Sequence, residues 1–212
     1  VDTAGIRRKG RTKQVLDKFS VIMALKALDR CDIAVILVDA SEGITDQDAT
    51  IAGYAYERGR GCVIAVNKWD LTKAREITIE DIERQVKDKF KFLDFAPVMV
   101  LSAKTGRGVD KLLPQVELIC DEYVRSVPTG RLNECLERAV AKNPISSYRG
   151  KFVKIFYSVQ IKNRPPTFKC FINYPQGIHF SYERYLINSL REVFGFSGTP
   201  VRLVFSGKSK RV

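Results

Sequence analysis

Short, wholly apolar segments separated by helix-like stretches are the feature that most constrains how this chain can fold. Three such runs occupy residues 33–38, 62–66 and 98–101. A continuous apolar run of this length is typical of a strand buried on both faces of a sheet. Helical periodicity predicts helices over residues 14–28, 46–58, 79–91 and 109–124. The pattern therefore predicts an α/β domain with a parallel sheet, whose chemistry lies at the carboxyl ends of the strands.

The last of these helices carries a long set of apolar residues at spacings of three and four. We expect them to share one inward face: Val109, Leu112, Leu113, Val116, Ile119, Cys120 and Tyr123.

The pattern changes at Val127-Pro128-Thr129-Gly130, which we interpret as a boundary between domains at 1–128 and 129–212. The second part predicts a helix, two strands, a helix and a strand, over 131–142, 152–161, 168–172, 181–194 and 201–205. That order gives a small αββαβ domain with helices on one face of a three-stranded sheet. In the first strand Val153, Ile155, Tyr157, Val159 and Ile161 should share a face. Of the chain's 21 aromatic residues, 13 follow residue 128, and we interpret most of them as core packing.

Positive charge is concentrated in this second part. The chain carries a net charge of +12, of which residues 129–212 hold +11. A small domain this basic usually meets a polyanion, so nucleic acid or the ribosome is the leading partner. An acidic protein, a membrane surface or a merely solvated face remain alternatives. The candidate phosphate contacts are Lys151, Lys154, Lys162, Arg164, Lys169, Lys208, Lys210 and Arg211.

The cysteines and the hydropathy pattern bear on where the protein works. The five cysteines are isolated and mostly lie in apolar patterns, which indicates reduced core thiols in a cytoplasmic protein and no CxxC site. No apolar run approaches the roughly 20 residues that span a bilayer. We expect a cytoplasmic monomer that does not contact a membrane.

Polar motifs follow two of the predicted strands. Asn67-Lys68-Trp69-Asp70 comes after 62–66, and Ser102-Ala103-Lys104 comes after 98–101. The chain opens with Asp2-Thr3-Ala4-Gly5. In this order, at strand ends, these are three motifs of guanine-nucleotide-binding proteins. The alternative is an ordinary doubly wound domain with polar strand-to-helix turns.

Each motif has a physical role in a site for GTP or GDP. The Asp70 carboxylate would accept hydrogen bonds from N1 and N2 of guanine, which adenine does not offer. The stem of Lys68 would lie along the base, and Asn67 would tie its loop to neighbouring backbone. Backbone N–H groups at Ser102 and Ala103 would reach the guanine O6. Asp2 would hold Mg²⁺ through water, and the Gly5 N–H would meet a γ-phosphate.

The phosphate-binding half of such a site is not expected in this chain. The one GKS run is Gly207-Lys208-Ser209, and Arg202 stands where the first glycine of a GxxxxGK[ST] loop would be. We interpret this run as a coincidence in a basic tail. We therefore expect an N-terminally incomplete GTPase domain taken from a longer protein, inactive by itself and without a catalytic residue of its own.

Taken together, several segments resemble one family. They are DTAG with the basic stretch 7–11, residues 19–30, Asp39-Ala40-Ser41-Glu42-Gly43-Ile44, NKWD, SAK and the basic αββαβ domain. The chain is similar over its whole length to the bacterial Der (EngA) family, which has two Era-like GTPase domains followed by a KH-like domain. The resemblance places the chain at the second GTPase domain and the KH-like domain. It implies GTP hydrolysis with Mg²⁺, a role in assembly of the large ribosomal subunit and an upstream first GTPase domain.

Two positions depart from better-known patterns. Ile6 stands where Ras-type enzymes carry the glutamine that orients water, so the resemblance implies help from a monovalent cation. Gly195-Phe196-Ser197-Gly198 spells the GxxG of RNA-gripping KH domains, but it lies between a helix and a strand. We interpret it as a helix cap.

Two functions from different classes follow. The leading hypothesis is a GTPase switch whose nucleotide state controls ribosome binding. The alternative is a basic ribosome- or RNA-binding adaptor that binds no nucleotide by itself. An ATP-using α/β enzyme is disfavoured by Asp70.

Overall fold

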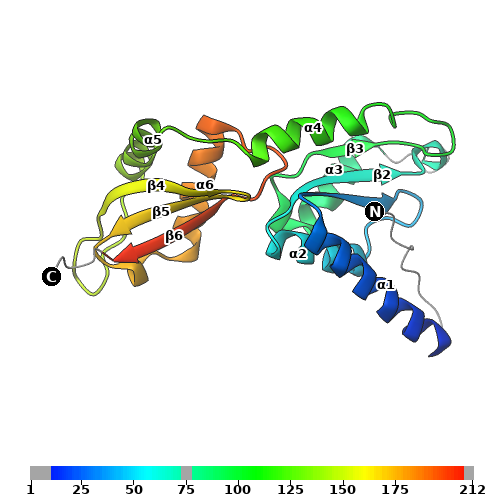
Figure 1. The fold of residues 1–212 in the computed structure, drawn as a ribbon, viewed down its shortest axis with the longest axis horizontal. Coiled ribbons are helices and arrows are strands. Elements are labelled where there is room, and N and C mark those ends of the chain that lie inside the picture. The colour runs from blue at the N-terminus through cyan, green and yellow to red at the C-terminus, as the bar shows by residue number, and fades with distance from the viewer. Residues whose placement is uncertain (1–10, 73–77, 208–212) are drawn as a thin grey trace. The chain divides into compact units, whose positions relative to one another are not determined.

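The computed structural model of the chain describes residues 11–72 and 78–207, with side chains from residue 21 onward (Figure 1). Its contacts divide the chain into two compact units, Val1–Cys120 and Asp121–Val212. The division falls before the predicted boundary because Gln160 of the second unit binds the backbone of Arg125 and Val127. The boundary at residue 128 itself stays a prediction. Among the described residues, no helix has both the length and the apolar character needed to cross a bilayer.

A parallel sheet forms the centre of the first unit. Its described strands are β1 (Ile33–Asp39), β2 (Gly61–Asn67) and β3 (Val98–Val100), in that spatial order. The predicted strand at 62–66 is confirmed as wholly buried, with every residue at 0% exposure. The same prediction for β1 is wrong, because Val35 and Leu37 are 42% and 57% exposed. Among the described strands β1 is an edge, and only one of its faces is buried there.

The helices of this unit are α1 (Arg11–Arg30), α2 (Asp46–Glu57), α3 (Ile79–Lys89) and most of α4 (Leu112–Tyr123), whose last three residues belong to the second unit. Capping boxes explain where two of them begin. Thr45 and Asp48 exchange hydrogen bonds at the start of α2, and Thr78 and Asp81 do the same at the start of α3. Each pair satisfies two backbone donors that a helix leaves free. A short turn, η3 (Lys91–Leu93), continues α3.

The predicted inward face of α4 is wrong in part. Ile119 and Tyr123 are buried, but Leu113 is 71% exposed and Val109 and Cys120 are also exposed. At 3.6 residues per turn, positions 113 and 120 lie about 80–100° around the helix from Leu112, so they cannot share its narrow buried stripe. Cys120 is consequently an exposed thiol, against the expectation that the cysteines lie in the core.

The second unit has the predicted αββαβ order. Its elements are α5 (Thr129–Lys142), β4 (Ile155–Asn163), β5 (Pro166–Ile172), α6 (Phe180–Phe194) and β6 (Arg202–Gly207), with a turn η4 (Pro175–Gly177) before α6. β5 lies between antiparallel β4 and parallel β6. One face of this sheet packs with α5 and α6 around Phe168, Leu186 and Leu190. Figure 1 shows α6 passing behind the three strands.

Strand β4 does not keep the expected alternation. Its pairing with β5 shifts register between Ile155 and Tyr157, and again between Gln160 and Lys162. Each shift adds a residue and turns the following side chains to the opposite face. Ile155 therefore packs against the core while Tyr157 is 46% exposed, and Ser158 is buried in its place. The prediction that Ile155 and Tyr157 share a face is wrong.

The outer edge of β4 is closed by Asn133 of α5. Asn133 Oδ1 accepts from the Ser158 N–H at 2.8 Å, and its Nδ2 donates to the Ser158 carbonyl at 2.9 Å and to the Thr129 carbonyl at 2.8 Å. Ser158 is 0% exposed, so water does not replace these partners. Asn133 thereby satisfies the Ser158 donor and acceptor, which this edge strand would otherwise leave without partners.

Asn133→Ala is expected to lower the free energy of unfolding of this unit by about 1–3 kcal/mol, the usual cost of leaving a buried polar group unsatisfied. Amide hydrogen exchange along β4 measures this loss of stability, and we expect the largest fall in protection at the Ser158 amide. Glu137→Ala, an exposed change on the same helix, is the control and should leave exchange unchanged. Equal protection at Ser158 in Asn133→Ala and Glu137→Ala would show that Asn133 does not hold the edge.

Candidate functional site

Two loops meet at the carboxyl edge of the parallel sheet. One runs from Asn67 through the turn η1 (Trp69–Leu71) after β2, and the other from Ser102 to Gly108 after β3. The Trp69 N–H donates to the Leu101 carbonyl at 3.1 Å, and this hydrogen bond joins the two loops. The structure thus brings together Asn67, Lys68, Asp70, Ser102 and Ala103, which the sequence places 32 or more positions apart across the two motifs.

Asp70 is oriented by Ser102. The Ser102 hydroxyl donates to Asp70 Oδ1 at 2.6 Å, and Ser102 itself is only 1% exposed. Ser102 also accepts from the Thr105 N–H at 3.3 Å through the same Oγ. An ionised carboxylate has about four lone-pair positions, so Asp70 keeps acceptor capacity beyond this bond. The arrangement presents a fixed, partly exposed acceptor suited to a ligand edge that carries N–H donors.

Asn67 ties the two loops together, as one of its predicted roles requires. Its Oδ1 accepts from the Ala103 N–H at 2.9 Å, and Lys68 turns the chain with a left-handed φ of 62°. The Ser102 N–H donates to the Arg107 carbonyl at 2.9 Å. Both backbone donors expected to reach a guanine O6 therefore have acceptors within the chain. The contact with O6 stays a prediction. It requires the Ala103 N–H either to divide its hydrogen bond between Asn67 Oδ1 and the base or to give up the bond to Asn67.

Lys68 has a partner that the sequence reasoning did not identify. Its Nζ lies 2.5 Å from Asp39 Oδ2, while the Ser41 N–H and hydroxyl donate to Asp39 Oδ1 at 2.8 and 2.6 Å. Burial alone would raise the pKa of Asp39, but the hydrogen bonds from Lys68 and Ser41 outweigh it and hold the pKa below its ordinary value. The sequence shows only that Asp39 ends an apolar run, and the pairing itself depends on β1 lying beside β2.

The remaining predicted nucleotide residues contribute less to the observed geometry. Lys104 is exposed at the tip of its loop. Asp2, Thr3, Ala4 and Gly5 lie outside the described residues, and with them the predicted contacts to γ-phosphate and Mg²⁺. Within the described part of the chain, no cluster of three or more His, Cys, Asp or Glu side chains is arranged to hold a metal ion.

The predicted phosphate contacts of the second unit do not form one cluster. Lys151 and Lys154 precede β4, with the Lys151 ammonium 5.8 Å from the ring centre of Tyr174. Lys162 and Arg164 lie at its far end, roughly 25 Å away along a nine-residue strand. Lys169 lies on β5 between these groups. Lys208, Lys210 and Arg211 lie outside the described residues.

The GxxG segment is confirmed as a helix cap. Gly195 ends α6 with φ 88°, and its N–H donates to the Arg191 carbonyl. The Phe196 N–H donates to Glu122 Oε2 at 2.6 Å, and Arg191 donates to the Phe196 and Thr199 carbonyls. A carboxylate bonded to this turn would repel a phosphate. The turn therefore does not offer the backbone donors by which a KH loop grips RNA.

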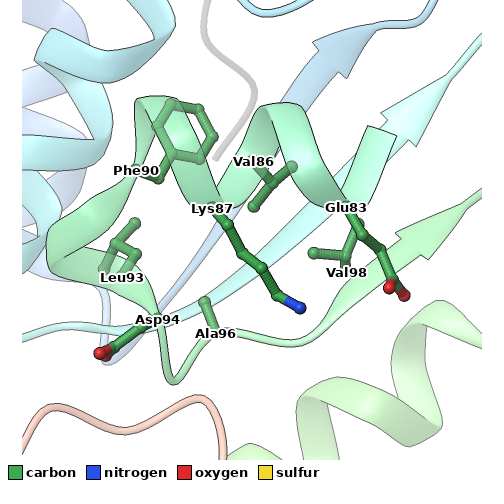
Figure 2. Close-up of a pocket in the computed structure, with 8 residues that line it drawn as sticks. All are labelled: Glu83, Val86, Lys87, Phe90, Leu93, Asp94, Ala96 and Val98. Atoms are coloured by element: carbon green, nitrogen blue, oxygen red, sulfur yellow. The ribbon is translucent and has the colours of Figure 1, made fainter. Parts of the chain in front are cut away.

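A pocket in the first unit is separate from the two loops. It holds about 210 Å³ and is lined by Val86, Phe90, Leu93, Ala96 and Val98 with the charged Glu83, Lys87 and Asp94. Figure 2 shows the Lys87 side chain extending between those of Glu83 and Asp94. Val98 begins β3, whereas the loops follow the carboxyl ends of the strands. The pocket is therefore not part of the loop site.

Comparisons with known proteins match both units. Residues 18–122 match the model described as the elongation factor Tu GTP binding domain. Residues 126–206 match the model of the KH-domain-like region of EngA bacterial GTPase enzymes, C-terminal. The GTPase Der of Syntrophotalea carbinolica is 49% identical over 100% of this chain and 48% of its own length. The chain belongs to the Der (EngA) family.

Other Der relatives agree over the same span. The GTPase Der of Citrifermentans bemidjiense is 45% identical over 100% of this chain and 48% of its own, and that of Geobacillus thermodenitrificans is 45% identical over 96% and 47%. The chain therefore spans about half the length of the curated relatives it matches. Among solved structures, Era from Aquifex aeolicus bound to GDP and aluminium fluoride is 17% identical over 98% of this chain and 75% of its own, with a TM-score of 0.45.

Proposed function

We propose that this chain is the base-recognition and ribosome-binding part of a GTP-hydrolysing switch protein that acts in assembly of the large ribosomal subunit in the cytoplasm. The observation that carries the proposal is the Asp70 carboxylate, held by the Ser102 hydroxyl beside the Asn67–Ala103 hydrogen bond. Family membership and the match to a GTP binding domain support it.

In the proposed site Asp70 accepts hydrogen bonds from N1–H and the N2 amino group of guanine. Ser102 holds the carboxylate in one orientation, so little order is lost when the base binds. Adenine presents an acceptor at N1 and no amino group at C2, so it would leave Asp70 unpaired. Asn67 keeps the second loop beside the first.

The chemistry at the phosphates lies beyond the described residues. When bound, Mg²⁺ would neutralise charge on the phosphates, with Asp2 proposed as a contact through water. The described residues supply binding and orientation of the base.

The basic unit supports the second half of the proposal. Residues 129–212 carry a net charge of +11, which suits ribosomal RNA. The alternative function, a basic adaptor that binds no nucleotide by itself, rests on the same charge. The two differ in whether the nucleotide state changes ribosome binding.

Co-sedimentation with purified large ribosomal subunits tests this proposal. The protein is extended to the length of its Der relatives and loaded with GDP or with a non-hydrolysable GTP analogue. We expect binding that falls steeply with salt, as counterion release requires, and that differs between the two nucleotides. Salt-dependent binding that is identical with either nucleotide would favour the adaptor.

A further inference from the structure

The small sheet of the second unit has one face that its helices do not cover. Phe168, Cys170 and Leu203 face the core with α5 and α6, so the alternate positions face away from it. The strand register arranges these positions in three rows of three: Tyr157–Phe171–Ser206, Val159–Lys169–Val204 and Lys162–Thr167–Arg202. We call these nine residues the open sheet face, in which Thr167 alone is buried, at 8% exposure, with its hydroxyl donating to the Pro165 carbonyl.

Aromatic rings occupy one end of the open sheet face. Tyr157 and Phe171 lie side by side on neighbouring strands, with ring centres 6.1 Å apart and ring planes inclined by 24°. Tyr157 is 46% exposed, although its apolar ring would be better buried. The expectation that most of the 13 aromatics after residue 128 serve as core packing is wrong, because only six of them lie in or against the core. Tyr157 is one of four that are exposed. The Tyr157 and Phe171 rings offer flat apolar surface on which a planar ring can stack.

Cations are interleaved with these rings. The Lys169 ammonium lies 5.1 Å from the ring centre of Phe171, in the middle row of the open sheet face. Lys162 and Arg202 are exposed in the row that follows. The sheet thus carries stacking surface at one end and positive charge along the remainder.

Within residues 129–212, negative charge is confined to the two helices. The four acidic residues after residue 128 are Glu134 and Glu137 of α5 and Glu183 and Glu192 of α6. The sequences of β4, β5 and β6 contain no aspartate or glutamate. An anionic ligand would therefore meet only positive charge on the strands, whereas the helices carry charges of both signs.

We propose that the open sheet face binds single-stranded RNA, with bases stacking on Tyr157 and Phe171 and phosphates contacting Lys169, Lys162 and Arg202. This proposal rests on the proposed function and names the surface that would carry it. Exposed rings need unstacked bases, which single strands offer and duplexes do not. An acidic peptide would use the cations but would gain little from the rings.

The test measures binding of this chain to a fluorescently labelled ten-nucleotide uridine RNA by anisotropy, with a ten-base-pair RNA duplex in parallel. Loss of one base–aromatic stack in Tyr157→Ala or Phe171→Ala should weaken binding of the single strand by about 5- to 150-fold. Tyr157→Leu keeps apolar bulk without the aromatic ring, and it should weaken binding similarly. Lys169→Gln should weaken binding of both the single-stranded RNA and the duplex, because both carry phosphates.

Two changes away from the open sheet face are the matched controls. Phe152→Ala removes an aromatic ring that is 89% exposed, and Lys142→Gln removes an exposed charge from α5. Both should bind the single strand within about twofold of the unchanged chain, since neither residue belongs to the open sheet face.

Several results would overturn the proposal. One is single-strand affinity that Tyr157→Ala and Tyr157→Leu leave unchanged. Another is duplex binding as tight as single-strand binding. A third is self-association of the chain that Tyr157→Ala abolishes, which would show that a second copy covers this face. Asp70→Asn should not alter RNA binding, so loss of guanine recognition and loss of RNA stacking are separately visible.

Discussion

Asp70→Asn is expected to weaken binding of GTP and GDP by about 10- to 150-fold, since a hydrogen bond to a charged group contributes roughly 1.5–3 kcal/mol. In the same variant, xanthine nucleotides should bind relatively better. The Ser102 hydroxyl would still donate to Oδ1 of the new side chain, so the amide nitrogen would take the position of Oδ2. An N–H donor there pairs with the O2 of xanthine and clashes with the N2 amino group of guanine.

Competition calorimetry with GDP and XDP measures this change in base preference. It uses the protein extended to the length of its relatives. Asp110→Asn is the control, because Asp110 is an exposed carboxylate in the next loop segment and outside the site. Unchanged GDP affinity in Asp70→Asn would remove Asp70 from base recognition.

Gly108→Ala is expected to destabilise the first unit by about 2–5 kcal/mol, more than Gly106→Ala. Both glycines have positive φ values, 75° and 78°, which cost an alanine roughly 1–2 kcal/mol. A Cβ at Gly108 would also lie 2.7 Å from the Val100 carbonyl oxygen, whereas a Cβ at Gly106 would meet nothing within 4 Å. That backbone contact adds a further overpacking cost of about 1–3 kcal/mol.

Chemical denaturation followed by Trp69 fluorescence measures the difference, because Trp69 is the chain's one tryptophan and lies beside this loop. Displacement of the loop should also weaken binding of guanine nucleotides, because Ser102, which orients Asp70, lies on this loop. Equal stabilities for Gly108→Ala and Gly106→Ala would mean that the close approach to Val100 does not constrain the loop.

Much of the first unit follows from local patterns. The apolar run 62–66 predicted a buried central strand, and parallel strands necessarily bring their following loops to one edge, so the meeting of the Asp70 and Ser102 loops was foreseeable. The pairing of Lys68 with Asp39 was not. It depends on the side-by-side register of β1 and β2, which no spacing in the sequence states.

The second unit shows where patterns mislead. Alternation predicted one face for Ile155 and Tyr157, but a register shift between them reversed it. Such a shift depends on pairing with β5 and on the side-chain hydrogen bonds from Asn133, which are long-range. The inversion matters because it places Tyr157 on the open sheet face instead of in the core.

The most direct test of base recognition is the selectivity of the unaltered protein at the length of its Der relatives. Calorimetric titrations with GDP and ADP under identical conditions compare the two bases. A site that hydrogen-bonds one base edge commonly rejects an analogue lacking those donors by about 10⁴-fold. We expect saturable GDP binding and no measurable ADP binding at the same concentrations. ADP affinity within tenfold of GDP would contradict the assignment of Asp70, Asn67 and Ser102 to a guanine site.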